Sequence, residues 1–82
     1  MIKGQVVAHL VNGDVITGEV CELNEEGLEA FKEMKDHCMC IFREGRQGVL
    51  QVILEGKGTS IVFSLSNCLF VEFNLEGAEW DD

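Results

Sequence analysis

The stretch over residues 9–20, "HLVNGDVITGEV", constrains the fold more than any other part of the sequence. Asn12-Gly13 divides two runs of strand-forming residues, and this dipeptide favours the tight turn of a β-hairpin because both residues tolerate positive φ. Gly18 then interrupts the second run, and a glycine inside a strand marks a bend or a close approach of another backbone. The pattern predicts an antiparallel pair of strands, 5–11 and 15–23, with the second strand bent at Gly18.

One segment after this hairpin changes from strand to helix periodicity. Leu28, Phe31 and Met34 recur at helical spacing, and asparagine is a favoured helix-capping residue, so Asn24 is a suitable first residue. The sequence predicts a short helical insertion over about residues 24–36.

From His37 onward the apolar residues alternate again, and glycine alone separates the segments because the chain contains no proline. We expect strands within residues 37–45, 48–56, 59–67 and 68–75. The predicted fold is mostly β: a small, strongly bent antiparallel barrel of the SH3 type, with five or six strands and one short helical insertion. This domain covers residues 1–74, and residues 75–82 are predicted to form an acidic C-terminal tail.

Size and charge limit the function. A chain of 82 residues that is 46% hydrophobic has more apolar surface than a small monomer hides easily, which predicts self-association. The net charge of −9 repels nucleic acid on average, so an RNA site would have to be local. Arg43, Arg46 and Lys57 are the positive residues that could form one, although solubilising charges on loops are the alternative interpretation.

Four cysteines, Cys21, Cys38, Cys40 and Cys68, are interpreted as reduced thiols of a cytoplasmic protein. Alternation along the predicted strand from His37 would place Cys38 and Cys40 on one face, which favours core packing over a metal site. We therefore expect no metal and no cofactor.

The sequence contains neither a leader-like apolar stretch at its start nor an apolar run of membrane-spanning length, so we expect no membrane partner. It also contains no recognisable catalytic motif, and we expect that the protein is not an enzyme.

Two stretches carry a resemblance to a known family. The run "LVNGDVITGEVCELN" over residues 10–24 resembles the first motif of the Sm and Sm-like (LSm) proteins, with Gly13 at the turn, Gly18 at the bend and Asn24 at the position of an acidic residue. The run "IVFSLSNCLFV" over residues 61–71 resembles the second motif, with Asn67 in the turn between two strands. The resemblance implies a bent barrel that pairs its edge strands with neighbouring copies.

On this resemblance we expect a homo-oligomeric ring, usually of about five to eight subunits. The resemblance also implies single-stranded RNA binding at the ring rim. Its predicted RNA-binding residues are Asn24 and Asn67, helped by Arg43, Arg46 and Lys57. The predicted interface residues are Ile61, Val62, Phe63, Leu69, Phe70 and Val71.

This sequence has Ser64-Leu65 where the second Sm motif has Arg-Gly. A second hypothesis is therefore kept: an acidic oligomeric scaffold that engages a basic protein partner and binds no RNA.

Overall fold

The computed structural model describes residues 1–56 and 58–80. Its elements in chain order are β1 (Ile2–Leu10), β2 (Val15–Thr17), β3 (Cys21–Leu23), α1 (Glu25–Glu44), β4 (Val49–Ile53), β5 (Ser60–Ser64), the 3-10 turn η1 (Leu65–Asn67) and β6 (Cys68–Glu76). The described residues are mostly β with one α-helix, as predicted.

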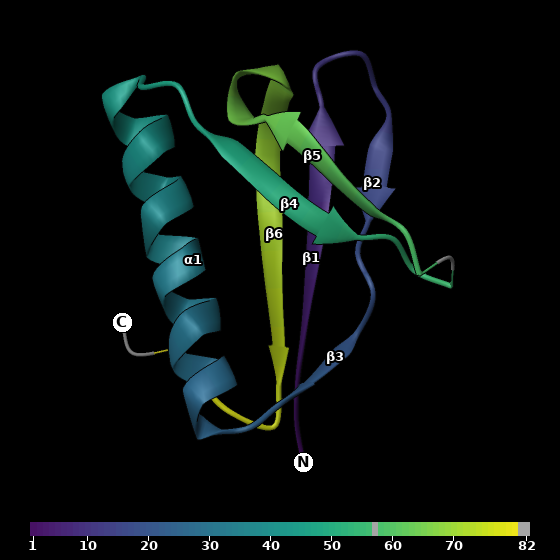
Figure 1. The fold of residues 1–82 in the computed structure, drawn as a ribbon. Helices are drawn as coiled ribbons and strands as arrows, with labels where there is room; N and C mark the ends of the chain where they lie inside the picture. The colour runs from purple at the N-terminus through teal and green to yellow at the C-terminus, as the bar shows by residue number, and fades with distance from the viewer. Residues whose placement is uncertain (57, 81–82) are drawn as a thin grey trace.

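The strands form two antiparallel sheets that cross each other (Figure 1). In the larger sheet β1 is central: β2 and β3 pair with its two halves on one edge, and β6 pairs along the other. The smaller sheet is the β4–β5 hairpin. One isolated bridge between Gly18 and Leu54 connects the two sheets. Among the described residues no ladder joins β5 to β6, so no closed barrel is found.

Gly18 lies where the predicted second strand bends. A Cβ built at this position would lie 2.6 Å from the carbonyl oxygen of Val6 and 2.8 Å from Cγ1 of Val52. Only a residue without a side chain fits between these two strands, so the chain turns there and resumes as β3. The predicted bend is confirmed, and it divides one expected strand into two.

The helix is longer than the sequence predicted, and the predicted strand over residues 37–45 is wrong. α1 runs to Glu44 and ends at Gly45, whose φ of 66° is the left-handed geometry that commonly terminates helices. Cys38 and Ile41 are buried because they continue the stripe that begins at Phe31. The apolar run from His37 fits both a strand and a helix, and burial of this stripe against the sheets favours the helix.

The core lies between α1 and the two sheets. Its buried residues come from every layer: Ala8, Cys38, Ile41, Leu50, Val52, Leu65 and Cys68. The helix therefore closes one side of the β structure.

The segment predicted as an acidic tail is partly ordered against the same chain. β6 continues to Glu76, and the Trp80 ring stacks on Phe31 with 5.7 Å between the centroids. The Lys35 ammonium lies 4.1 Å from the centroid of the Trp80 ring. Trp80 thus packs on α1 of the same chain. The last two residues of the predicted tail, 81 and 82, lie outside the described residues.

Candidate functional site: unpaired strand edges and an apolar groove

The two asparagines of the predicted RNA site lie at opposite ends of the molecule. α1 begins at the bottom of Figure 1, and η1 lies at the top. Asn24 caps α1, where its Oδ1 accepts a hydrogen bond from the backbone N–H of Gly27 at 2.7 Å. Asn67 belongs to η1, and its backbone carbonyl accepts a hydrogen bond from Val11 at 2.9 Å. The fold does not bring Asn24 and Asn67 together within one chain.

The predicted arginines lie near the C-terminal end of α1. Arg43 Nη2 donates to Cys40 Sγ at 3.3 Å, and Arg46 Nε is 2.7 Å from Glu44 Oε2. The carboxylate of Glu44 balances the charge of Arg46. The loop that follows α1 contacts η1, because Leu65 N donates to the carbonyl of Gly48 at 2.8 Å. Lys57 lies outside the described residues, and RNA binding stays a prediction.

The predicted interface residues of β5 point in two directions. Ile61 and Phe63 pair with the buried residues Val52 and Leu50, so they face the core. Val62 faces outward with 62% of its surface exposed. Among the described strands only β4 pairs with β5, so the backbone N–H and C=O groups along the other edge of β5 have no strand partner.

The predicted interface residues of β6 show the same division. Val71 packs against the core, whereas Leu69 and Phe70 are 64% and 49% exposed. The β1–β6 register shifts between His9 and Leu10, which leaves Leu69 without a partner on β1 in a bulge. Within the described part of the chain, β1 is the only strand that pairs with β6. The opposite edge of β6 is therefore open, like the outer edge of β5.

An apolar groove of about 600 Å³ lies between α1 and β6. We call it the α1–β6 groove; it is lined by Lys35, Cys38, Met39, Phe42, Leu69, Phe70, Val71 and Phe73. Met39 and Phe42 are 53% and 38% exposed. The helical wall of this groove was not expected from the sequence, because Met39 and Phe42 lie in the segment that was predicted to be a strand. The spacing of residues 35, 39 and 42 is the helical signal that identifies them on one face.

The outer face of the large sheet carries one histidine. His9 faces away from Ala8 and Leu10, which belong to the core side. Its ring stacks on Phe70 with 4.1 Å between the centroids, and Nε2 lies 3.6 Å from Glu72 Oε1. This stacking holds the half-exposed Phe70 ring against the sheet beside the open edge of β6.

The cysteines do not form the pair that the predicted strand implied. Cys38 and Cys40 are two residues apart on a helix, about 200° around its axis, so Cys38 is buried while Cys40 lies beside Arg43. Burial raises the pKa of the Cys38 thiol, with a smaller contribution from Cys68, and burial also raises the pKa of Cys68. A raised pKa keeps both thiols protonated and unreactive, as in a core cysteine.

In the described ranges, no cluster of three or more His, Cys, Asp and Glu side chains is arranged to hold a metal ion. Nor does any described helix combine the length and apolar character needed to cross a bilayer. No model of a known protein family matches the chain, and no curated protein or solved structure matches it. The open edges of β5 and β6 and the α1–β6 groove are therefore the features from which we infer a function.

Proposed function

We propose that this protein is a self-assembling scaffold in which β5 of one copy pairs with the open edge of β6 of the next. In this arrangement β5 enters the α1–β6 groove. The observation that carries the proposal is that β5 and β6 each have an unpaired strand edge with exposed apolar side chains. Unpaired edges are normally covered or blocked in monomeric proteins, because they recruit further strands.

The hydrophobic effect supports the same arrangement. Val62, Leu69 and Phe70 are about half or more exposed, and burying an exposed side chain of this kind contributes about 1.5–3 kcal/mol. A strand added to β6 would also cover the exposed surfaces of Met39 and Phe42 on the helical wall of the groove. Assembly thus supplies apolar burial that an 82-residue chain lacks alone.

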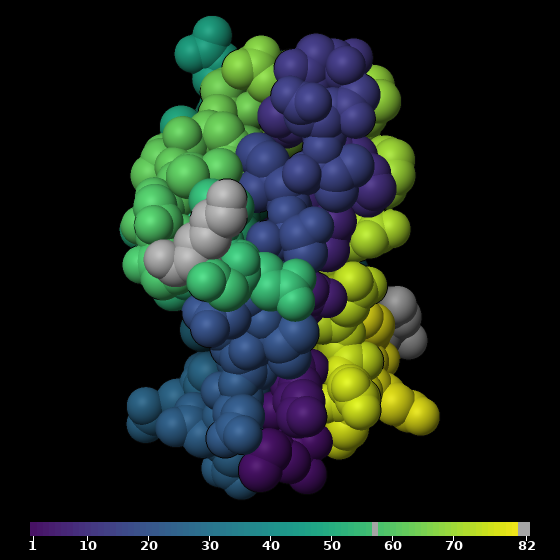
Figure 2. Space-filling view, turned by 90° about the vertical axis from the view of Figure 1, so that its right-hand side faces the viewer, coloured from purple at the N-terminus to yellow at the C-terminus, as the bar shows by residue number. Residues whose placement is uncertain are grey.

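The two edges lie on different sides of the molecule. In Figure 2 the β4–β5 hairpin (teal to green) and β6 (yellow) flank the purple and blue segments of β1 to β3. Pairing β5 with β6 is therefore head-to-tail, and repeated head-to-tail contacts give a closed ring when the rotation between copies closes. We propose a homo-oligomeric ring on this basis.

We also propose that the two sheets correspond to an Sm-like barrel with α1 inserted. Three features support this: the strand order β6–β1–β2, the bridge that continues from Gly18 to the β4–β5 hairpin, and the 3-10 turn that connects β5 to β6. The acidic balance of the chain, with fifteen acidic and six basic side chains, suits a basic protein as the partner of the assembly.

Solution mass tests the assembly. We expect native mass spectrometry to find a closed oligomer for the wild type, and smaller species for Val62→Asp and for Leu69→Asp. Val11→Asp is the matched control, because Val11 is 60% exposed but lies outside both edges, beside the β1–β2 turn. A monomeric wild type, or unchanged mass in both edge variants, would contradict the proposal.

Mixing the two edge variants tests the head-to-tail direction. Val62→Asp retains the β6 edge, and Leu69→Asp retains the β5 edge, so the mixture should form a heterodimer that cannot grow further. Pairing of β6 with β6 would instead let Val62→Asp dimerise alone, and this result would exclude the head-to-tail contact.

The same spectra distinguish a scaffold from an RNA-binding ring. With a short oligouridine added at low salt, we expect no bound RNA, since the fold separates Asn24 from Asn67 and pairs Arg46 with Glu44. Uptake of the oligonucleotide, lost in an Arg43→Ala variant, would favour RNA binding.

A further inference from the structure

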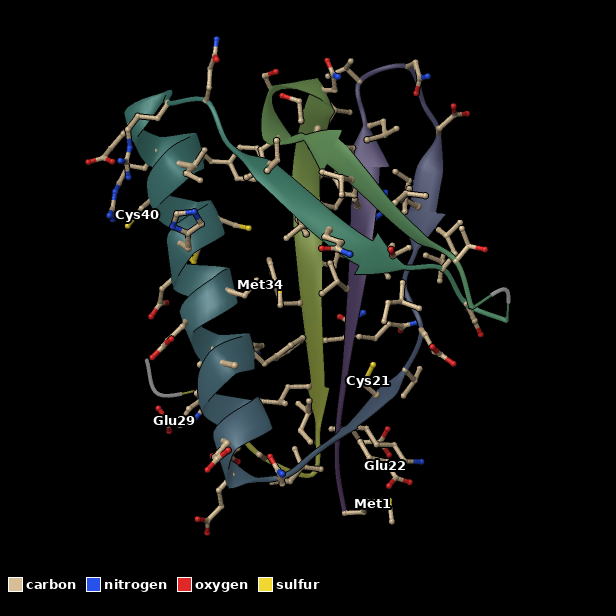
Figure 3. The ribbon with its side chains drawn as sticks, viewed as in Figure 1. Met1, Cys21, Glu22, Glu29, Met34 and Cys40 are labelled. Atoms are coloured by element: carbon tan, nitrogen blue, oxygen red, sulfur yellow. The ribbon has the colours of Figure 1, made fainter. Side chains whose placement is uncertain are left out.

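A second apolar cavity, separate from the α1–β6 groove, lies between α1, β1, β3 and β4. Its volume is about 230 Å³, and Phe31 and Met34 of α1 and Val52 of β4 form its walls. Figure 3 shows Met34 projecting from α1 toward the strands, with Cys21 on the β3 side of the same space. We call this cavity the inner pocket.

The inner pocket exists because β3 and β4 diverge. Beyond the Gly18 bridge β3 pairs with β1 alone, while β4 crosses toward α1, so the two strands leave a space between them. Gly4 forms part of its floor, and a Cβ there would lie 2.8 Å from Leu23 Cδ1 and 3.2 Å from the Phe31 ring. The small residue Ala30 lines the helical side. Small residues at these two positions keep the pocket open.

The described lining residues of the inner pocket include a negatively charged residue and no positively charged one. Gln5, Glu19 and Gln51 are its polar lining residues, and Gln5 is held by a hydrogen bond from its Nε2 to the carbonyl of Gly18 at 3.0 Å. Glu19 is the acidic residue among the described lining residues, and none of them is basic. An anionic group is therefore disfavoured at this pocket, and a cationic group is favoured.

We propose that the inner pocket binds a small amphiphile with an apolar tail and a primary ammonium head, the head lying beside Glu19. An apolar cavity of about 150 Å³ accepts benzene, with six carbons, so a 230 Å³ pocket fits a tail of roughly eight or nine carbons. The site uses no residue of β5 or β6, so it is independent of the proposed assembly.

Protection of a thiol tests the pocket in the wild-type protein. Cys21 is exposed and lines the inner pocket, whereas Cys40 is partly exposed and lies outside it. We expect n-octylammonium, below its micelle concentration, to slow iodoacetamide labelling of Cys21 about tenfold at about tenfold excess over Kd. Labelling of Cys40, measured by mass spectrometry in the same sample, should not change.

Two related ligands test the head group. Octanol should protect Cys21 more weakly than octylammonium, and octanoate should not protect it. Glu19→Gln should reduce octylammonium protection to that of octanol. Equal protection by octanoate and octylammonium would overturn the charge assignment.

Filling the pocket tests its location. Ala30→Leu adds a side chain inside the pocket and should abolish protection, while His37→Leu adds the same side chain at an exposed position of α1 outside it. Circular dichroism checks that both variants fold. Absence of protection in the wild type, or full protection in a folded Ala30→Leu variant, would overturn the proposal, whatever the oligomeric state.

Discussion

At the residue scale, Gly18 shows how one position determines the path of a strand. Its backbone lies close to Val6 on one side and to Val52 on the other, and it carries the bridge that connects the two sheets. Neither contact involves the conformational freedom of glycine, since Gly18 does not have a positive φ. The requirement is space alone.

Replacement of Gly18 by alanine should destabilise the fold by about 2 kcal/mol or more, because the added methyl group meets a backbone carbonyl that cannot move freely. Urea unfolding followed by circular dichroism measures the loss. Gly27→Ala is the matched control: it lies in the first turns of α1, where alanine is favoured, and we expect a change of at most about 1 kcal/mol. Equal stability of Gly18→Ala and wild type would show that the strands separate without cost.

The buried thiol of Cys38 should make the stability of the protein depend on pH. Thiols of an unfolded chain ionise near about pH 8.5, while burial keeps the pKa of Cys38 above its ordinary value. As the pH rises above 8.5, the unfolded state loses a proton that the folded state retains, so the free energy of unfolding decreases. The contribution of the Cys38 thiol to the free energy of unfolding is fully present below this pH. It is lost as the pH rises through the raised pKa of Cys38 in the folded state.

We therefore expect the urea midpoint of the wild type to fall between about pH 8 and pH 10 more steeply than that of Cys38→Ala. Parallel slopes for the wild type and Cys38→Ala would mean that the buried thiol does not contribute.

At the element scale, α1 is the helical insertion between β3 and β4, and it forms one wall of both the α1–β6 groove and the inner pocket. One face of the helix packs on the core through Phe31, Cys38 and Ile41, and Met39 and Phe42 on an adjacent strip line the α1–β6 groove. Its first turns line the inner pocket. The position of α1 therefore controls both proposed sites.

Asn24 fixes the start of this helix, and its role as a cap is separate from any role in RNA binding. Asn24→Ala should lower the free energy of unfolding by about 1 kcal/mol, because the N–H of Gly27 loses its acceptor. Asn24→Asp retains an acceptor oxygen and adds a favourable charge at the helix N-terminus, so its stability should match the wild type within about 0.5 kcal/mol. Urea unfolding compares the three proteins, and an equal loss in both variants would exclude capping as the cause.

At the scale of the whole molecule, charge opposes the assembly that the apolar edges favour. The net charge is −9 on a body of 34 × 31 × 17 Å. At about 10 mM salt the Debye length is roughly 30 Å, so charges across the whole subunit repel each other, and at about 150 mM it is roughly 8 Å. Copies of the chain should repel each other most at low ionic strength.

Raising NaCl from about 10 mM to about 150 mM should therefore strengthen association. Sedimentation velocity over a concentration series should show the oligomer forming at lower protein concentration in the higher salt. Val62→Asp measured in parallel should remain dissociated in both buffers, because salt does not restore its β5 edge. Weaker association of the wild type at higher salt would indicate an interface held by opposite charges.

The sequence by itself determined the elements whose signals are local. Asn12-Gly13 and Gly18 predicted the hairpin and its bend, and the apolar alternation predicted β4, β5 and β6. Asn24 was correctly expected at the start of the helix. These predictions succeeded because turn geometry, capping and alternation depend on residues a few positions apart.

Only the tertiary structure decided the features that depend on which distant segments pack against each face of a helix or strand. The run from His37 to Phe42 fits both periodicities, and α1 continues through it because Cys38 and Ile41 find a core to pack against. The same packing separates Asn24 from Asn67, creates the α1–β6 groove and opens the inner pocket where β3 leaves β4. A short apolar segment takes the conformation that buries it best, and the surface available for that burial is built by residues distant in the sequence.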